Sequence, residues 1–140
     1  MTELQPGLVG EASEIVTDEL TAAVYASGLV AAFATPAMIG LMEGAAFEAT
    51  RSQLPDGQTT VGIEVNIRHL AATPVRMRVR ARAELTRVEG RKLYFNVEAW
   101  DEVEKIGEGT HTRMIVDEAR FNERFKAKTA MEHERRTTET

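Results

Sequence analysis

The sequence contains no cysteine and has three histidines among its 140 residues. The missing cysteine excludes disulfides, thiolate metal sites and a cysteine nucleophile, and it fits a reducing cytosol. The three histidines form no close pair in the sequence, so no metal site is predicted. A surplus of positive charge is also missing, because the net charge is −5. Phosphate binding needs such a surplus, so nucleic acid is not an expected partner.

Long apolar runs are absent as well. No stretch approaches the roughly 18–20 apolar residues of a membrane span. The amino-terminal stretch, MTELQPGLVGEASE, is acidic and lacks the basic start and apolar core of a signal peptide. We therefore expect a cytoplasmic protein with no membrane partner. Its length suits one domain with a substantial hydrophobic core.

The first half of the chain predicts one strand and one long helix. Residues 8–17 alternate weakly, which indicates a strand, and Asp18 to about Tyr25 has the character of a short helix. Thr35 followed by Pro36 signals the start of the long helix, with threonine as N-cap and proline in the first turn. This helix is expected to run to about Ser52, where LPDGQ supplies a turn.

The second half predicts four strands, because apolar residues recur there with a period of two. The four segments are TTVGIEVNIRHL, VRMRVRARAEL, LYFNVEAW and IGEGTHTRMIV. Short turns join them, and such connections build an antiparallel sheet. In the first segment Val61, Ile63, Val65 and Ile67 share one face, which we expect to turn toward the helix.

A sheet with one apolar face must cover that face, and the long helix is the one element able to do so. An antiparallel sheet wrapped around one helix is the hotdog architecture, an α+β fold. Another α+β roll could be built from the same elements. We assign residues 1–128 to this domain. Residues 129–140 are expected to form a polar tail that is solvated or partly helical.

Two side chains are candidates for chemistry. On a helical wheel, Glu43 falls at the edge of the apolar face, with Ile39 and Phe47 four residues to either side. It is either a rim carboxylate that reaches water or a carboxylate held in a cleft for proton transfer. His69 continues the phase of the apolar residues before it, so it is either a hydrogen-bonded core histidine or a catalyst at a strand end.

A row of four arginines, Arg76, Arg78, Arg80 and Arg82, falls on the polar face of one predicted strand. A phosphate-binding role is conceivable. Ion pairs with Glu84 in the same row and with Glu98 on the next strand explain the row more simply.

Several spaced motifs resemble the fluoroacetyl-CoA thioesterase-like family of hotdog proteins, from about Leu8 to Lys128. They are FATPAMIGLMEGAAFEAT, VGIEVNIRHLAATP and AELTRVEGRKLYFNVEAWDEVEKIGEGTHTRMIV. The resemblance implies a homodimer that hydrolyses an acyl-CoA thioester, with coenzyme A present as part of the substrate and no separate cofactor. It implies that Thr35, Glu43 and His69 are catalytic and that Gly62 and Arg113 contact the substrate.

The sequence departs from the family in the segment before the long helix. There the family archetype has a phenylalanine-lined lid, whereas YASGLVAAFAT places Ala26 and Leu29 at those positions. Phe33 remains nearer the helix and is assigned to substrate binding. A short or medium acyl group other than fluoroacetyl is therefore expected.

The leading hypothesis places the thioester carbonyl at the amino-terminal end of the long helix, where free N–H groups stabilise an oxyanion. His69 is the expected general base or acid, and Glu43 either orients the attacking water or attacks the thioester itself. Whether both come from one chain of the dimer is left open. The alternatives are hydration or dehydration of an acyl thioester, and a catalytically silent dimer that binds acyl-CoA.

Overall fold

The computed structural model describes residues 4–26 and 28–138. The elements in chain order are β1 (Val9–Ile15), the 3₁₀ helix η1 (Asp18–Leu20), α1 (Thr35–Thr50), the 3₁₀ helix η2 (Arg51–Gln53), β2 (Gln58–His69), β3 (Arg78–Glu89), β4 (Lys92–Trp100), β5 (Lys105–Asp117) and α2 (Glu118–Thr138). Within the described ranges, no helix has the length and apolar character needed to cross a membrane.

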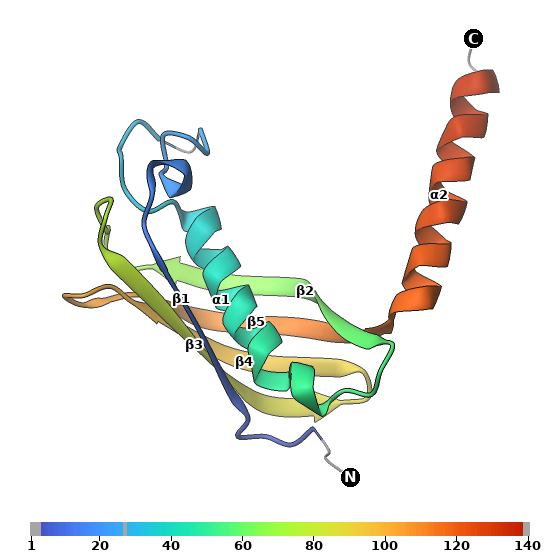
Figure 1. Cartoon of the computed structure of the whole chain (residues 1–140), viewed down its shortest axis with the longest axis horizontal. Coiled ribbons are helices and arrows are strands. Elements are labelled where there is room, and N and C mark those ends of the chain that lie inside the picture. The colour runs from blue at the N-terminus through green and yellow to red at the C-terminus, as the bar shows by residue number, and fades with distance from the viewer. Residues whose placement is uncertain (1–3, 27, 139–140) are drawn as a thin grey trace.

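The five strands form one antiparallel sheet in the order β1-β3-β4-β5-β2. The sheet curls around α1, which lies across one of its faces (Figure 1). This arrangement is the hotdog fold, so the predicted fold class is confirmed. Because β2 stands at the end of the order, next to β5, its other edge has no neighbouring strand within residues 4–26 and 28–138.

The core lies between α1 and the strands β3 and β4. The buried side chains of α1 are Ala37, Met38, Leu41, Met42, Ala45, Ala46, Ala49 and Thr50. Those of β3 and β4 are Val79, Ala81, Ala83, Leu85, Leu93, Phe95, Val97 and Ala99, in the predicted alternation. Small residues let the elements approach closely. A Cβ atom at Gly10 of β1 would collide with the backbone of Ala45 and Ala49.

Two predictions about the helical segments are corrected. The Asp18–Tyr25 segment forms a helix over Asp18–Leu20 alone. Residues 22–26 contribute no buried side chain, so packing does not stabilise a longer helix there. At the start of α1 the N-cap is Ala34, and Thr35 is already inside the helix. The Thr35 hydroxyl is therefore not used as a cap.

The prediction that the apolar residues of β2 turn together toward the helix fails for Val61. Gly62 faces Glu43 of α1, so Val61 next to it lies on the opposite face, whereas Val65 pairs with the buried His111 and keeps the predicted face. Ile63 and Val65 are nevertheless exposed. Their exposed fractions are 47% and 43%. The pairing of β2 with β5 shifts its register between Gly62 and Glu64, and such a bulge breaks the simple alternation of faces. The exposure of Ile63 and Val65 follows from their place on an edge strand of the sheet.

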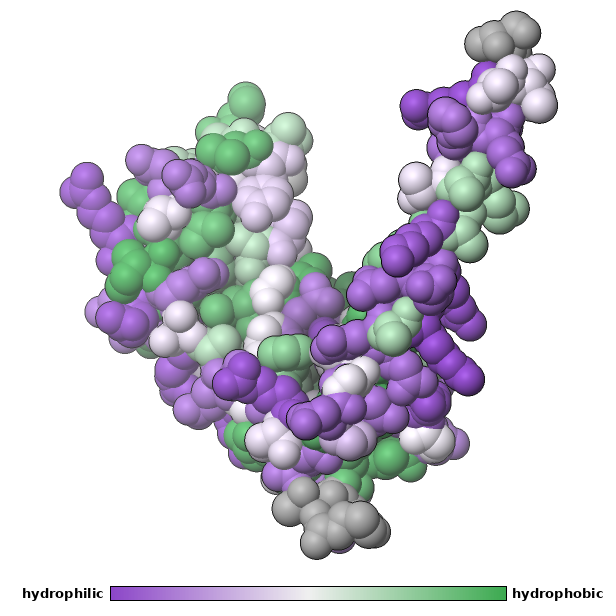
Figure 2. Space-filling model, turned by 45° about the vertical axis from the view of Figure 1, so that its right-hand side comes forward, coloured by the Kyte–Doolittle hydropathy of each residue, from purple (hydrophilic) through white to green (hydrophobic). Residues whose placement is uncertain are grey.

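The helix α2 extends away from the sheet (Figures 1 and 2). It runs from Glu118 to Thr138, so the expected boundary between residues 128 and 129 falls inside it. Residues of high helix propensity fill this stretch, and Glu132 pairs with Arg135 and Arg136 one turn further along. The polar stretch thus continues the helix up to residue 138.

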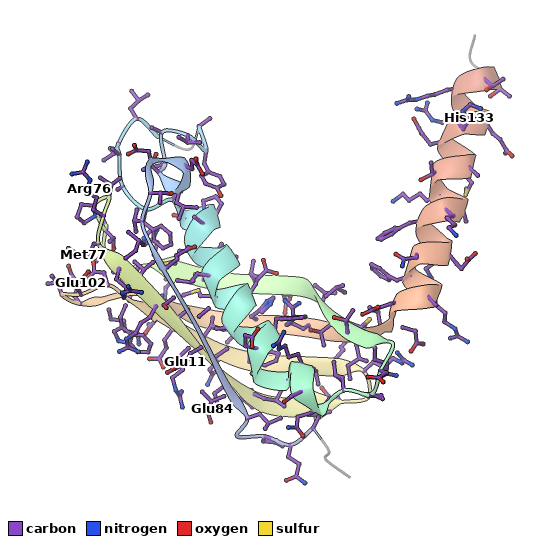
Figure 3. All side chains as sticks on the ribbon, in the orientation of Figure 1. Glu11, Arg76, Met77, Glu84, Glu102 and His133 are labelled. Atoms are coloured by element: carbon purple, nitrogen blue, oxygen red, sulfur yellow. The ribbon has the colours of Figure 1, made fainter. Side chains whose placement is uncertain are left out.

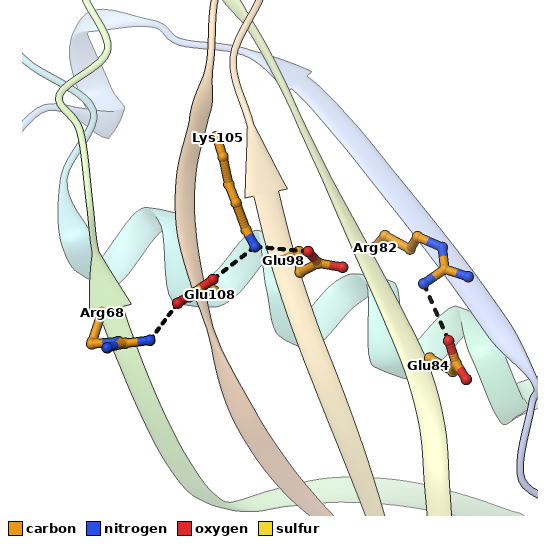
Figure 4. A network of polar contacts seen from close by, with 6 residues as sticks. All are labelled: Arg68, Arg82, Glu84, Glu98, Lys105 and Glu108. Carbon is orange, nitrogen blue, oxygen red and sulfur yellow. Dashed lines mark hydrogen bonds and ion pairs between the residues drawn. The ribbon is translucent and has the colours of Figure 1, made fainter.

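Arg82, one of the four arginines of the row, lies among ion pairs on the sheet face turned away from α1 (Figure 4). Arg82 pairs with Glu84 at 3.3 Å, as predicted. Glu98 instead pairs with Lys105 at 2.8 Å, which also contacts Glu108. Arg80 stacks on the ring of Trp100, with 4.4 Å between the guanidinium carbon and the ring centroid. Half of this row thus has partners on the sheet itself.

Candidate functional site

The first group of the candidate site joins the start of α1 to the end of β2. The Oγ1 atom of Thr35 lies 2.8 Å from Nδ1 of His69, within hydrogen-bonding distance. Thr35 is in the first turn of α1, where backbone N–H groups have no acceptor inside the helix. A hydroxyl, an imidazole and the positive end of a helix dipole therefore meet at one place.

The environment of His69 favours its neutral form. Partial burial lowers the pKa of this histidine below its usual value of 6.5, because a charged imidazolium is poorly solvated there. Its Nε2 atom is buried and has no hydrogen-bond partner among the described residues. A neutral imidazole with one unused ring nitrogen is suited to proton transfer.

The second group surrounds Glu43, two turns further along α1. The Oε2 atom of Glu43 lies 3.6 Å from Nη1 of Arg113 and 3.8 Å from Nε2 of His111. The Glu43 side chain is 40% exposed, whereas those of Arg113 and His111 are nearly inaccessible. Glu43 is thus a partly exposed carboxylate that faces a buried cation. This environment differs from that of a carboxylate surrounded only by water at the rim of a helix.

Arg113 is fixed by β2. Its Nε atom donates to Oγ1 of Thr60 and its Nη2 atom donates to the Thr60 carbonyl, both at 2.9 Å. Burial lowers the pKa of Arg113, while the charge of Glu43 acts in the opposite direction. A buried guanidinium needs such partners, since desolvation of an unpaired charge is costly.

His111 is a member of this group that was not singled out from the sequence. Its Nδ1 atom lies 2.8 Å from the Glu64 carbonyl, and its Nε2 atom lies 3.2 Å from Nη1 of Arg113. The Nδ1–H tautomer satisfies both contacts, since it donates to the carbonyl and accepts from Arg113. Burial lowers the pKa of His111. The sequence feature that points to His111 is its position two residues before Arg113, because residues two apart lie on the same face of a strand.

Gly62 leaves room for the Glu43 carboxylate. A Cβ atom at this position would overlap Oε2 of Glu43 and would stand 3.0 Å from Cε1 of His111. Any side chain here would push the carboxylate away from its partners. Gly62 belongs to β2, so the second group lies beside the unpaired edge of the sheet.

The two groups stand apart within one chain. Thr35 and Glu43 are eight residues apart on α1, which corresponds to about 12 Å along the helix axis. Phe33 is buried at the foot of the first group, and its N–H donates to the Thr73 carbonyl at 2.8 Å. The six predicted site residues are thus divided, with Phe33, Thr35 and His69 in one group and Glu43, Gly62 and Arg113 in the other.

The third histidine takes no part in either group. His133 lies toward the far end of α2, away from the sheet (Figure 3). Within the described ranges, no three His, Cys, Asp or Glu side chains are grouped as a metal ion requires.

Comparison with known proteins gives the same fold and a family. The model of the family described as fluoroacetyl-CoA-specific thioesterase matches residues 16–119. A fluoroacetyl-CoA thioesterase from Streptantibioticus cattleyicolor is 42% identical over 97 residues, which is 69% of this chain and 70% of that protein.

Two solved structures extend the likeness to almost the whole chain. A mutant of fluoroacetyl-CoA thioesterase in complex with acetyl-CoA is 33% identical with a TM-score of 0.85, covering 90% of this chain and 99% of its own. A thioesterase superfamily member from Thermus thermophilus is 29% identical with a TM-score of 0.88, covering 95% and 98%. The resemblance expected from the sequence is confirmed, and the chain belongs to the fluoroacetyl-CoA-specific thioesterase family.

Proposed function

We propose that this protein hydrolyses a short or medium acyl-CoA thioester to the free acid and coenzyme A. The observation that carries the proposal is the 2.8 Å contact between Thr35 and His69 at the amino-terminal end of α1. Membership of a thioesterase family supports the same reaction.

The first group suits the carbonyl end of the substrate. N–H groups of the first turn of α1 stabilise the oxyanion that forms when water adds to the thioester carbon. His69, neutral because its pKa is lowered by burial, accepts the proton of that water and later returns it to the departing thiolate. Thr35 holds the imidazole through Nδ1, which leaves Nε2, buried and without a hydrogen-bond partner among the described residues, as the ring nitrogen for proton transfer.

The protein is proposed to act as a homodimer in which two β2 edges pair antiparallel. A two-fold axis between Val65 and Asn66 places His69 across from the partner's Gly62. Ile63 and Val65, exposed in the single chain, become part of the interface. This pairing also brings the partner's Glu43 toward the Thr35–His69 pair, so that each complete site takes residues from both chains.

Glu43 is proposed to orient the attacking water. Arg113 and His111 hold its carboxylate near Gly62, and its exposed part faces the unpaired edge. A carboxylate kept in place by a buried guanidinium is positioned to accept a hydrogen bond from water. Arg113, Gly62 and the buried Phe33 then shape the space around the acyl group.

The acyl group is proposed to differ from fluoroacetyl. Ala26 and Leu29 replace the phenylalanines of the family's lid, and Leu29 is 98% exposed in the single chain. Smaller and aliphatic side chains leave more room beside the carbonyl site than aromatic rings do.

The test is a free-thiol release assay over acetyl-, fluoroacetyl-, butyryl- and hexanoyl-CoA, run beside Glu43→Gln and His69→Ala. We expect hydrolysis of at least one acyl-CoA, and a fall in kcat of about 10²–10⁴-fold in either variant. Glu48→Gln is the matched control, because Glu48 is an exposed carboxylate on the same helix that pairs with Arg51.

Hydrolysis that survives both site substitutions would overturn the assignment of the residues. Binding of coenzyme A without thiol release from any thioester would favour the silent dimer. Product analysis that finds a hydrated acyl thioester would favour the hydratase.

A further inference from the structure

The helix α2 has an apolar stripe that is largely exposed, with only Phe121 at its start half-buried beside β5. Phe121 and Phe125 lie one turn apart, with ring centroids 4.8 Å from each other in a T-shaped contact. Phe125 is 54% exposed and Met131 is 68% exposed. Over its described length, Glu118–Thr138, the helix has no buried residue. It stands clear of the sheet in Figure 2.

An isolated helix gains most of its stability by packing an apolar face against something else. Exposed aromatic rings on a projecting helix mark a surface that another element covers. The question is therefore which surface meets this stripe.

A second exposed apolar surface lies in the loop between η1 and α1. Val24, Tyr25, Leu29 and Val30 are all exposed there, and we call these four side chains the loop surface. The loop is tied to the segment after β2, because Ala32 bridges to Pro74 and the Phe33 N–H bonds to Thr73. In Figure 1 the loop and α2 project at opposite ends of the sheet.

In the proposed dimer, the pairing of two β2 edges places the apolar stripe of α2 near the loop surface of the partner. The foot of α2 is level with the start of β2, since Gln58 pairs with Asp117 and the Glu118 N–H donates to the Gly57 carbonyl. With the proposed axis between Val65 and Asn66, this foot would lie beyond the end of the partner's β2. The segment that follows β2 there is the one to which the loop is bonded, through Thr73 and Pro74.

The charges of the two surfaces are complementary. The α2 sequence carries six Lys and Arg residues against four Glu residues. The segment 17–32 carries Asp18 and Glu19 and no basic residue. An excess of positive charge on the helix thus meets an acidic loop, which favours this orientation of the two chains.

We propose that α2 of one protomer docks on the loop surface of a second copy of this chain, with Phe121 and Phe125 against Leu29 and Val30. This inference rests on the homodimer of the proposed function and goes beyond it. The loop surface leads directly to Phe33 and Thr35, so the docked helix braces the segment that positions the partner's reacting group.

The test uses the natural absence of cysteine. In one chain Leu29 and Phe125 belong to segments at opposite ends of β2, about 36 Å apart along that strand. A disulfide requires Cα atoms within about 7 Å. The double variant Leu29→Cys/Phe125→Cys is therefore expected to form covalent dimers under mild oxidation, whereas each single variant stays unlinked.

If the double variant is dimeric by light scattering but forms no disulfide, the proposed docking is wrong, whereas the proposed dimer is not contradicted. A covalent dimer from Leu29→Cys alone would overturn it too, because the two loops would then face each other. Thiol release by the reduced double variant is measured separately, so a failed hydrolase assignment is distinguishable from a failed docking.

A second measurement needs no cross-link. Phe125→Asp is expected to raise the dimer dissociation constant by about tenfold or more, because a charge replaces an aromatic anchor. Ala130→Asp is the matched control on the opposite side of α2, and it is expected to change the constant by less than about twofold. Equal effects of the two substitutions would contradict the proposal.

Discussion

At the scale of single residues, the threonine at the head of α1 shows what a sequence motif leaves open. Thr35 before Pro36 predicts an N-cap, and the helix does begin there. The hydroxyl, however, bonds to His69, and Ala34 takes the capping position without a side-chain bond. The motif predicted the helix start correctly, but the use of the hydroxyl depends on a strand end 34 residues away.

The first prediction separates these two uses of Thr35. Thr35→Ala is expected to lower kcat/KM about 10–100-fold, because the imidazole loses its orienting partner. Thr35→Ser keeps the hydroxyl and is expected to recover most of the activity. A lost N-cap costs about 1 kcal/mol, so a comparable drop in unfolding free energy with unchanged kinetics would restore the capping interpretation.

The second prediction concerns pH. Burial lowers the pKa of both His69 and His111 in the folded state. Below the unfolded value of about 6.5 the unfolded chain binds more protons than the native state, so stability falls as pH falls. The unfolding free energy, measured by urea titration between pH 7.5 and 5, is expected to decline over this window.

The matched variant is His111→Gln, which removes one of the two titrating groups. It is expected to flatten the decline below pH 6.5. A free energy of unfolding that rises toward pH 5 would contradict the assignment of neutral histidines.

At the scale of elements, the strands facing α1 followed their sequence pattern and the edge strand did not. The alternation in β3 and β4 is fixed by burial on one face, so Val79, Leu85 and Phe95 lie where the period places them. In β2 the same period failed at the bulge between Gly62 and Glu64. A bulge depends on contacts with β5 and α1, and no local pattern encodes those contacts.

The third prediction tests the space that this bulged strand leaves for Glu43. Gly62→Ala is expected to lower kcat about 10–100-fold, since the added methyl group displaces the carboxylate. Gly40→Ala is the control, because a Cβ atom at Gly40 meets nothing within 4 Å. Circular dichroism of both variants should match the parent protein. If Gly62→Ala kept full activity, the assignment of Glu43 to the active site would be contradicted.

At the scale of the whole molecule, the fold class predicted from the sequence is confirmed, and the predicted site residues lie in two separate groups. The resemblance to the thioesterase family implies that Thr35, Glu43 and His69 act together. The single chain keeps Glu43 with Arg113 and Gly62, two helical turns from the Thr35–His69 pair. A contact between two chains leaves no local pattern in one sequence, so motifs do not show whether the proposed site is shared between two chains.

The fourth prediction tests this division by mixing two inactive variants. If each site combines Glu43 of one chain with His69 of the other, a heterodimer of Glu43→Gln and His69→Ala contains one intact site. Co-refolding equal amounts should then restore about a quarter of the parent activity, because half of the dimers are mixed. Activity that stays at the level of the separate variants would place all three residues in one chain.

The unpaired edge of β2 also has a consequence for the biogenesis of the protein. In the single chain, the outer edge of this strand has no neighbouring strand among the described residues, and it lies next to the exposed side chains of Ile63 and Val65. Such an edge pairs with any extended segment it meets, including those of unfinished copies. The single protomer is therefore the form most prone to aggregation, and it aggregates faster as its concentration rises.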